Sequence, residues 1–331
     1  MEETSCDLVQ ARKAFSRVGL ALSAIVATAT ILQLFCILVP QAIWGEDNWL
    51  AASSWGKWLI TFVPLYLVAI PTGLLILRKL PAQTPADNKL GAENFFAFMA
   101  IGFCLMYAGN LVGNTLAMLL SGGKAENAVE GYIMDTNPIK ILFMVILAPL
   151  LEEYVCRKQI IDRTRQYGEK TAVLLSALLF GLLHQNLFQF FYAFGLGLIF
   201  AYIYVRTGRL RYPVIMHAII NFMGAVVAPW ILSLVDLDAI AGMDPNAPQQ
   251  ELMAVLGKIL PGLLIYMLYA ALLLGVSIAG LVLLIIRCRK LTWQQAQNQL
   301  PQGTAAKTVY WNVGMVLYLL LCAAAIVFSL V

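Results

Sequence analysis

Long apolar stretches alternate with short polar ones along almost the whole of this chain. A helix needs about 20 mainly apolar residues to cross a bilayer, and nine segments come close to or exceed that length. They comprise residues 19–40, 58–77, 94–120, 138–160, 171–187, 189–206, 212–235, 258–287 and 310–331. The pattern predicts an all-α, polytopic membrane bundle of about 8–9 transmembrane helices.

The composition supports this class. Of the 331 residues 61% are hydrophobic and 12% charged, and the mean hydropathy is +0.79, whereas soluble domains have about 25% charged residues. No polar stretch is long enough to form a core of its own, so we expect one transmembrane domain over 19–331. Residues 1–18 lack the cleavage pattern of a signal peptide and are expected to form a cytoplasmic leader.

Lysine and arginine predict the orientation, because they concentrate in cytoplasmic segments. With the N-terminus inside, 18 of the 22 basic residues fall in cytoplasmic segments. The turn at 184–189 is the least certain boundary between helices, since "HQNLFQ" has neither Gly nor Pro. The expected location is a bacterial plasma membrane or an endoplasmic reticulum, and the spacing of the motifs described below favours the bacterial plasma membrane.

Two adjacent acids, Glu152 and Glu153, are the only ones of the 18 that lie within a predicted span. A charged residue near the bilayer centre costs on the order of 2.5–3.5 kcal/mol, so such residues are usually paired or functional. Glu153 and Arg157 are four residues apart and share a helix face, which predicts an ion pair. Glu152 points elsewhere and is either free for chemistry or a carboxylate that reaches the membrane surface.

Both histidines of the chain also fall in or beside predicted spans. Phe180 and His184 are four residues apart, as are His217 and Asn221. Either histidine could simply pack or form hydrogen bonds between helices. Combined with Glu152, the pattern favours water activation by a carboxylate and an imidazole, with His217 and Asn221 meeting the oxyanion.

Other chemistries have weaker support. Ser176 has no G-x-S-x-G around it, and Cys156 has no histidine nearby in sequence, so both are expected to pack. No cofactor is required by the sequence. Zinc remains an alternative, with Glu152, His184 and His217 as its ligands, although no H-E-x-x-H motif is present.

Three motifs occur in order: "EEYVCR" (152–157), "FGLLH" (180–184) and "HAIIN" (217–221). Together they resemble the E-E-x-x-x-R, F-x-x-x-H and H-x-x-x-N motifs of the CAAX-protease and bacteriocin-processing family of intramembrane proteases, which includes the type II CAAX prenyl endopeptidases. The resemblance covers roughly residues 138–230, the expected peptidase core. Cys156 and Lys158 depart from the Phe and Gly often found beside the arginine.

The resemblance implies an endopeptidase in which Glu152 is the base and His184 holds the water. Glu153 and Arg157 would then be structural, and His217 and Asn221 would form the oxyanion site. Members are labelled metalloproteases, but a metal-free glutamate mechanism is also assigned. The implied substrate is a membrane-anchored protein or peptide, either prenylated or a bacteriocin or pheromone precursor, and no nucleic-acid partner is expected.

Two other functions remain open: a catalytically silent immunity or scaffold protein of the same fold, and a proton-coupled transporter that uses Glu152 and His184 as a relay. The peptidase hypothesis also makes a geometric demand. For Glu152 and His184 to hold one water, the lipid boundary must lie beyond Arg157, nearer Asp162 or Arg163, and the helix would then continue into the cytoplasm.

Overall fold

The chain forms a bundle of helices, with no strand in the described residues 6–242, 244 and 246–330 of the computed structural model. The α-helices are α1 (Leu8–Trp44), α2 (Trp49–Ala52), α3 (Ser54–Pro64), α4 (Ile70–Leu77), α5 (Ala92–Ser121), α6 (Glu130–Ile133), α7 (Ala148–Glu153), α8 (Asp162–Thr164), α9 (Glu169–Leu183), α10 (Leu187–Thr207), α11 (Arg211–Phe222), α12 (Ala228–Leu232), α13 (Leu237–Ala241), α14 (Gln249–Cys288), α15 (Ala305–Tyr310) and α16 (Val313–Phe328). Other helical segments adjoin the α-helices. The π-helical ones are η1 (Leu65–Ala69), η2 (Ile141–Leu147), η3 (Tyr154–Ile161) and η5 (Met223–Val227), and η4 (Arg165–Tyr167) is a 3₁₀ turn. The all-α membrane bundle is confirmed.

Six helices of the described chain are long and apolar enough to cross a membrane. They are Leu8–Trp44, Ser54–Leu77, Ala92–Ser121, Leu187–Thr207, Arg211–Leu232 and Gln249–Cys288. Each contains one of the nine predicted spans or most of it. The other three predicted spans are also helical, but they are shorter or interrupted.

The boundaries of the shorter helices have local causes. The predicted span 171–187 ends at Leu183, because Gln185 adopts a positive φ of 49° and the Asn186 side chain caps α10 by accepting from the Phe188 N–H. The predicted span 310–331 is broken near its start, where Asn312 caps α16 by accepting from the Met315 N–H.

At the other end of the chain, the helix begins inside the predicted leader. Asp7 caps α1 by accepting from the backbone N–H groups of Val9 and Gln10, at 2.9 and 3.1 Å. Residues 8–18 therefore extend the first helix by almost three turns. The first five residues of the expected leader lie outside the described part of the chain.

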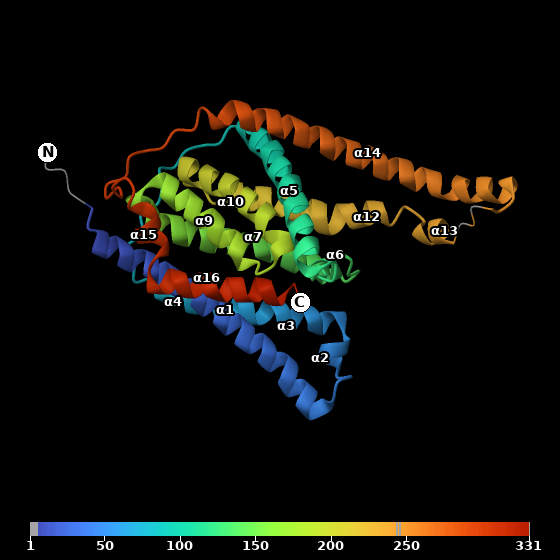
Figure 1. Cartoon of the computed structure of the whole chain (residues 1–331), viewed down its shortest axis with the longest axis horizontal. Coiled ribbons are helices and arrows are strands. Elements are labelled where there is room, and N and C mark those ends of the chain that lie inside the picture. Colours follow the sequence, from blue (N-terminus) through green and yellow to red (C-terminus); the bar gives the residue numbers. More distant parts are fainter. Residues whose placement is uncertain (1–5, 243, 245, 331) are drawn as a thin grey trace.

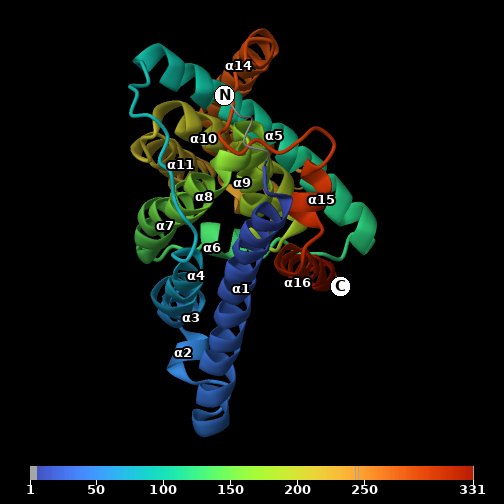
Figure 2. The ribbon, with the colours of Figure 1, turned by 90° about the vertical axis from the view of Figure 1, so that its left-hand side faces the viewer.

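The central helices lie between two outer groups. In Figure 1, α14 runs along one side and α1 lies with α16 and α3–α4 on the other, and Figure 2 shows the same separation from a second direction. Between them, α10 packs against α5 and α9. Gly109 on α5 permits this approach, because a Cβ there would lie 2.5 Å from the Cα of Tyr192.

The segments rich in basic residues meet at one end of the bundle, at the left of Figure 1. Backbone hydrogen bonds link Gln83 to Asp162 (2.7 Å), Asn88 to Thr207 (2.9 Å) and Leu300 to Tyr167 (3.1 Å). This gathering agrees with the alternation of charge along the sequence. That this end faces the cytoplasm stays a prediction.

Asp135 connects the loop before η2 to α3 at the opposite end of the bundle. Its carboxylate accepts hydrogen bonds from Ser54 Oγ at 2.6 Å, Trp58 Nε1 at 2.9 Å and the backbone N–H of Asn137 at 2.9 Å. These bonds, the one from Ser54 above all, hold the pKa of the Asp135 carboxyl below its ordinary value. The loop before η2 is thereby fixed to the start of α3.

Candidate active site

The helix that carries Glu152 and Glu153 contains a π-helical segment directly before them. In η2 the Ala148 N–H bonds to the Phe143 carbonyl, five residues back. The next carbonyl, that of Met144, would accept from residue 149 in the same pattern, but Pro149 has no N–H. The Asn221 side chain satisfies this carbonyl instead, with Nδ2 donating to Met144 O at 2.8 Å.

The predicted ion pair between Glu153 and Arg157 is present and fully buried. Arg157 Nε lies 2.8 Å from Glu153 Oε2, and both side chains have 0% exposure. The remaining side of the guanidinium donates to Ser176 Oγ at 2.8 Å and faces the Phe180 ring, 4.6 Å from its centroid. Ser176 in turn donates to the Cys156 carbonyl at 2.8 Å. Ser176 and Cys156 are thus buried parts of the helix packing, as expected.

His217 lies between the two glutamates. Its Nδ1 is 3.1 Å from Glu153 Oε1, and its Nε2 is 3.9 Å from Glu152 Oε2. The ring is confined by Phe180 and Phe200, each with its centroid 5.6 Å from that of the imidazole. The buried imidazole of His217 therefore lies between the Glu153 carboxylate, which is paired with Arg157, and the partly exposed carboxylate of Glu152.

Glu152 differs from Glu153 in exposure and in partners. Its side chain is 29% exposed, and the 3.9 Å contact to His217 is an ion-pair distance that is too long for a hydrogen bond. No hydrogen bond or ion pair joins Glu152 directly to His184 in the described part of the chain. The pairing of Glu152 with His217 is the feature that sequence spacing did not predict.

His184 is held at the end of α9. Its Nδ1 lies 2.9 Å from the carbonyl oxygen of Phe180, and its ring meets the Phe180 ring edge-on at 5.1 Å. Phe180 therefore contacts both histidines, which explains the F-x-x-x-H spacing physically. With Nδ1 engaged as donor, the Nε2 of His184 is left with a lone pair for another group.

The helix continues past Arg157, as expected, whereas the position of the lipid boundary beyond Arg157 stays a prediction. Helical turns run on through η3 and α8 to Tyr167. Asp162 is buried there and accepts from Tyr204 at 2.8 Å and from Lys158 at 2.5 Å. The glutamates are thus well inside the helix and not at its end.

A metal site does not form from these residues as arranged. Across the described residues no group of three or more His, Cys, Asp or Glu side chains lies close enough to hold an ion. The three residues considered above as zinc ligands, Glu152, His184 and His217, are thus not brought together as a metal-binding group in the described structure. His217 instead directs Nδ1 to Glu153.

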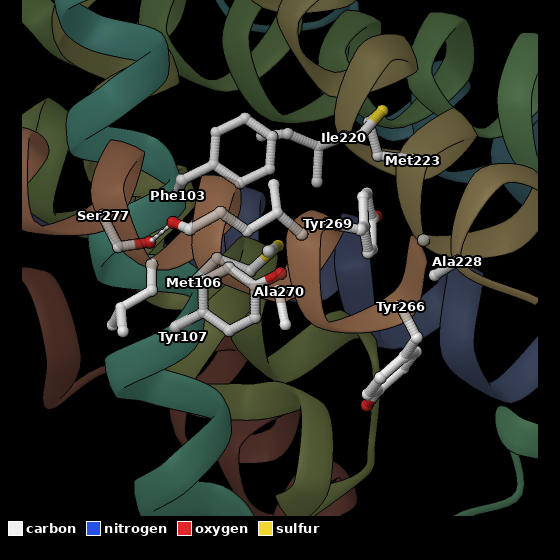
Figure 3. Close-up of a pocket in the computed structure, with 13 residues that line it drawn as sticks. Phe103, Met106, Tyr107, Ile220, Met223, Ala228, Tyr266, Tyr269, Ala270 and Ser277 are labelled. Atoms are coloured by element: carbon white, nitrogen blue, oxygen red, sulfur yellow. Dashed lines mark hydrogen bonds between the residues drawn. The ribbon is translucent and has the colours of Figure 1, made fainter. Parts of the chain in front are cut away.

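An apolar cavity of about 440 Å³ lies between α5, α11, η5 and α14. Figure 3 shows Phe103, Ile220, Met223 and Tyr269 around it, together with the hydroxyl groups of Ser277, Tyr107 and Tyr266. No acid, base or histidine lines this cavity. The candidate catalytic cluster faces η2 and α7 instead, so the cavity is not the hydrolytic site.

Comparisons with known proteins define the class. A family model described as type II CAAX prenyl endopeptidase Rce1-like matches residues 135–223. The membrane-embedded CAAX protease MroQ of Staphylococcus aureus (strain USA300) is 34% identical over 170 residues, which cover 47% of this chain and 68% of that protein. The putative membrane peptidase YdiL of Bacillus subtilis (strain 168) is 27% identical over 185 residues, 53% of this chain and 72% of that protein. No solved structure matches.

The chain therefore belongs to the Rce1-like family of CAAX proteases, which confirms the resemblance seen in the motifs. It is a multi-pass bacterial membrane protein of a peptidase family, whose substrates are membrane-associated proteins. The matched segment contains Glu152, Glu153, Arg157, His184 and His217 together with Phe180 and Asn221.

Proposed function

We propose that this protein is an intramembrane endopeptidase in which Glu152 activates the attacking water. The observation that supports this most strongly is the difference between the two adjacent glutamates. Arg157 neutralises Glu153 inside the protein, whereas Glu152 is 29% exposed and has only a loose contact with His217. A carboxylate that is available to solvent but held beside a fixed imidazole suits a general base.

In the proposed reaction Glu152 takes a proton from water as the water oxygen bonds to the carbonyl carbon of the scissile peptide. The carbonyl oxygen becomes an oxyanion. When the C–N bond breaks, the Glu152 carboxyl returns the proton to the leaving amine nitrogen. His184 holds the water through Nε2, because its Nδ1 is occupied by the Phe180 carbonyl.

The remaining residues position the carbonyl. The second N–H of Asn221 polarises its oxygen, and His217 does so through Nε2–H in its doubly protonated form, since Nδ1 donates to Glu153. Glu153, Arg157 and Phe180 fix the His217 ring. The proposed substrate is a membrane-anchored protein or peptide. A farnesylated C-terminal tail is the first candidate because of the family to which the chain belongs, and a bacteriocin or pheromone precursor is the second.

The test is cleavage of quenched-fluorescent peptides by the purified protein in detergent. The panel contains a farnesylated CAAX tail and membrane-anchored peptides without a prenyl group. Glu152→Gln should reduce kcat by about 10²–10⁴-fold, because it removes the proton acceptor while it keeps the shape. Glu251→Gln, at an exposed glutamate in the first turn of α14, is the matched control and should leave kcat unchanged.

Three results would contradict the proposal. Equal cleavage by wild type and Glu152→Gln would remove Glu152 as the base. No cleavage of any peptide by the folded wild type would favour a silent partner-binding protein. Loss of activity with a chelator and its return with zinc would replace the metal-free mechanism by a metal-dependent one.

A further inference from the structure

Two apolar cavities adjoin each other between α5, α11 and α14. The cavity of about 440 Å³ described above and a second one of about 370 Å³ share Phe103 as a lining residue. Along α5 the lining of the second cavity begins at Phe95, and that of the first cavity ends at Tyr107, a rise of about 18 Å. The two cavities therefore form one elongated space, which we call the apolar groove.

The apolar groove opens toward the outside of the bundle. Phe96 of α5 is 69% exposed and Ile219 of α11 is 37% exposed, and both line the second cavity. Its three walls belong to helices that are long and apolar enough to cross a membrane, so an opening between them faces the hydrocarbon of the bilayer. The length of the groove is close to half of the hydrocarbon thickness of about 30 Å, which is the depth of one leaflet.

One end of the groove lies where the basic segments of the chain gather. α5 begins and α14 ends there, as Figure 1 shows, and Arg287 Nη1 of α14 donates to Asn94 Oδ1 of α5 at 2.7 Å. Arg287 lies about two helical turns beyond Ala279, which lines the second cavity. The α14 wall of the groove thus leads to an arginine at this end.

The α11 wall leads to a second arginine, Arg211. Its guanidinium lies over the Tyr212 ring, 5.0 Å from the centroid, and donates to the Tyr212 hydroxyl at 3.3 Å. Tyr212 is seven residues before Ile219 and therefore lies on the same face of α11 as this lining residue. Arg211 is exposed and forms no ion pair among the described residues.

Positive charge exceeds negative charge around this end of the groove. Arg209 is paired with Asp87, and the 94% exposed Glu93 lies 3.9 Å from Arg287. Arg211 adds a positive charge that no acid of the described chain neutralises. An apolar groove that leads to such a charge at the membrane surface is complementary to an amphiphile with an anionic head group.

We propose that the apolar groove binds an anionic phospholipid of the bilayer, with one acyl chain in the groove and the phosphate at Arg211 and Arg287. A phospholipid fits better than the lipid anchor of a substrate, because no residue of the candidate active site lines the groove. The inference goes beyond the proposed peptidase function and does not depend on it. Because α11 also carries His217 and Asn221, the bound lipid packs against the helix that positions both of these side chains.

The test follows the thermal midpoint of the purified protein in uncharged detergent while phosphatidylglycerol or phosphatidylcholine with identical acyl chains is added, since a ligand of the folded state raises the midpoint. The wild type should bind phosphatidylglycerol about 25-fold more tightly, because each arginine contributes about fivefold. Arg211→Gln combined with Arg287→Gln should remove this preference. Lys13→Gln combined with Lys307→Gln, at exposed lysines of α1 and α15 at the same end of the bundle, is the matched control and should keep it.

Ala279→Phe tests the groove itself, because the larger side chain fills the second cavity and leaves every charge in place. It should weaken the binding of phosphatidylglycerol by about tenfold, since part of the acyl chain loses its apolar contact. Unchanged binding by this variant would overturn the proposal.

Three further results would also overturn it. The first is equal affinity of the wild type for the two lipids, and the second is an equal loss of preference in the lysine control. The third is a rise of the midpoint with glycerol phosphate or with the farnesylated peptide but not with phosphatidylglycerol, which would assign the site to a free phosphate or to the substrate. Glu152→Gln should bind phosphatidylglycerol as the wild type does, so this inference and the peptidase proposal fail separately.

Discussion

The surroundings of Glu153 and Glu152 differ in how fully each carboxylate is used, although the two residues are adjacent. Around Glu153 lies a sealed cluster with Arg157, Ser176 and Phe180, in which both carboxylate oxygens have partners and no atom of the ion pair is exposed. Around Glu152 the structure is more open, and the contact of its carboxylate with His217 Nε2 is 3.9 Å long. The cluster around Glu153 fixes His217 through its Nδ1, whereas the Glu152 carboxylate beside the same ring is held less tightly.

Removal of the arginine is expected to have the largest effect on stability. Arg157→Met would leave the Glu153 carboxylate buried without its cation, which costs about 3–5 kcal/mol. Glu152→Gln should change stability by less than about 0.5 kcal/mol. Thermal unfolding in detergent measures both. Equal thermal midpoints for Arg157→Met and Glu152→Gln would show that the surroundings of Glu153 and Glu152 do not differ in this way.

The contact between Asn221 and Met144 predicts a smaller loss. Asn221→Ala would leave the Met144 carbonyl without a partner in an apolar setting, at about 1–3 kcal/mol. Asn114→Ala is a suitable control, because the Asn114 amide bonds only to Asn110, one turn away on the same helix. If Asn221→Ala and Asn114→Ala unfold at the same temperature, the bond from Asn221 to the Met144 carbonyl does not stabilise the π-helical turn.

The smallest of the three expected losses of stability concerns Asp135, in the loop before η2. Its folded pKa is lowered, so its contribution to stability is present above the ordinary aspartate pKa of about 3.9 and is lost as the pH falls through the folded value. Asp135→Asn should lower stability by about 1 kcal/mol at pH 7. The difference from wild type should shrink below about pH 4. A difference that is constant from pH 7 to pH 3 would contradict this.

The sequence predicted the helices well because their apolar runs are long. It also predicted the Glu153–Arg157 pair, since both residues lie on one helix face and local spacing decides the contact. The same holds for Phe180 and His184. Charge patterning further anticipated that the basic segments gather at one end of the bundle.

Contacts between helices were not predictable in this way. The position of His217 between Glu152 and Glu153 depends on how α11 is placed against α7, and spacing within one helix contains no such information. Pro149 was the one overlooked signal, because a proline within a helix leaves a carbonyl without its usual donor and Asn221 supplies the replacement.

The π-helical segment η2 has a consequence for evolution. A π turn accommodates one residue more than an α turn, so a single residue can be lost from η2 while the helix on either side keeps its orientation. The same deletion in α7 between Pro149 and Glu152 would rotate both glutamates and the residues after them by about 100° relative to η2 and its contact with Asn221. Among descendants of this chain, length changes of one residue are therefore expected in 141–147 and should be selected against in 150–151.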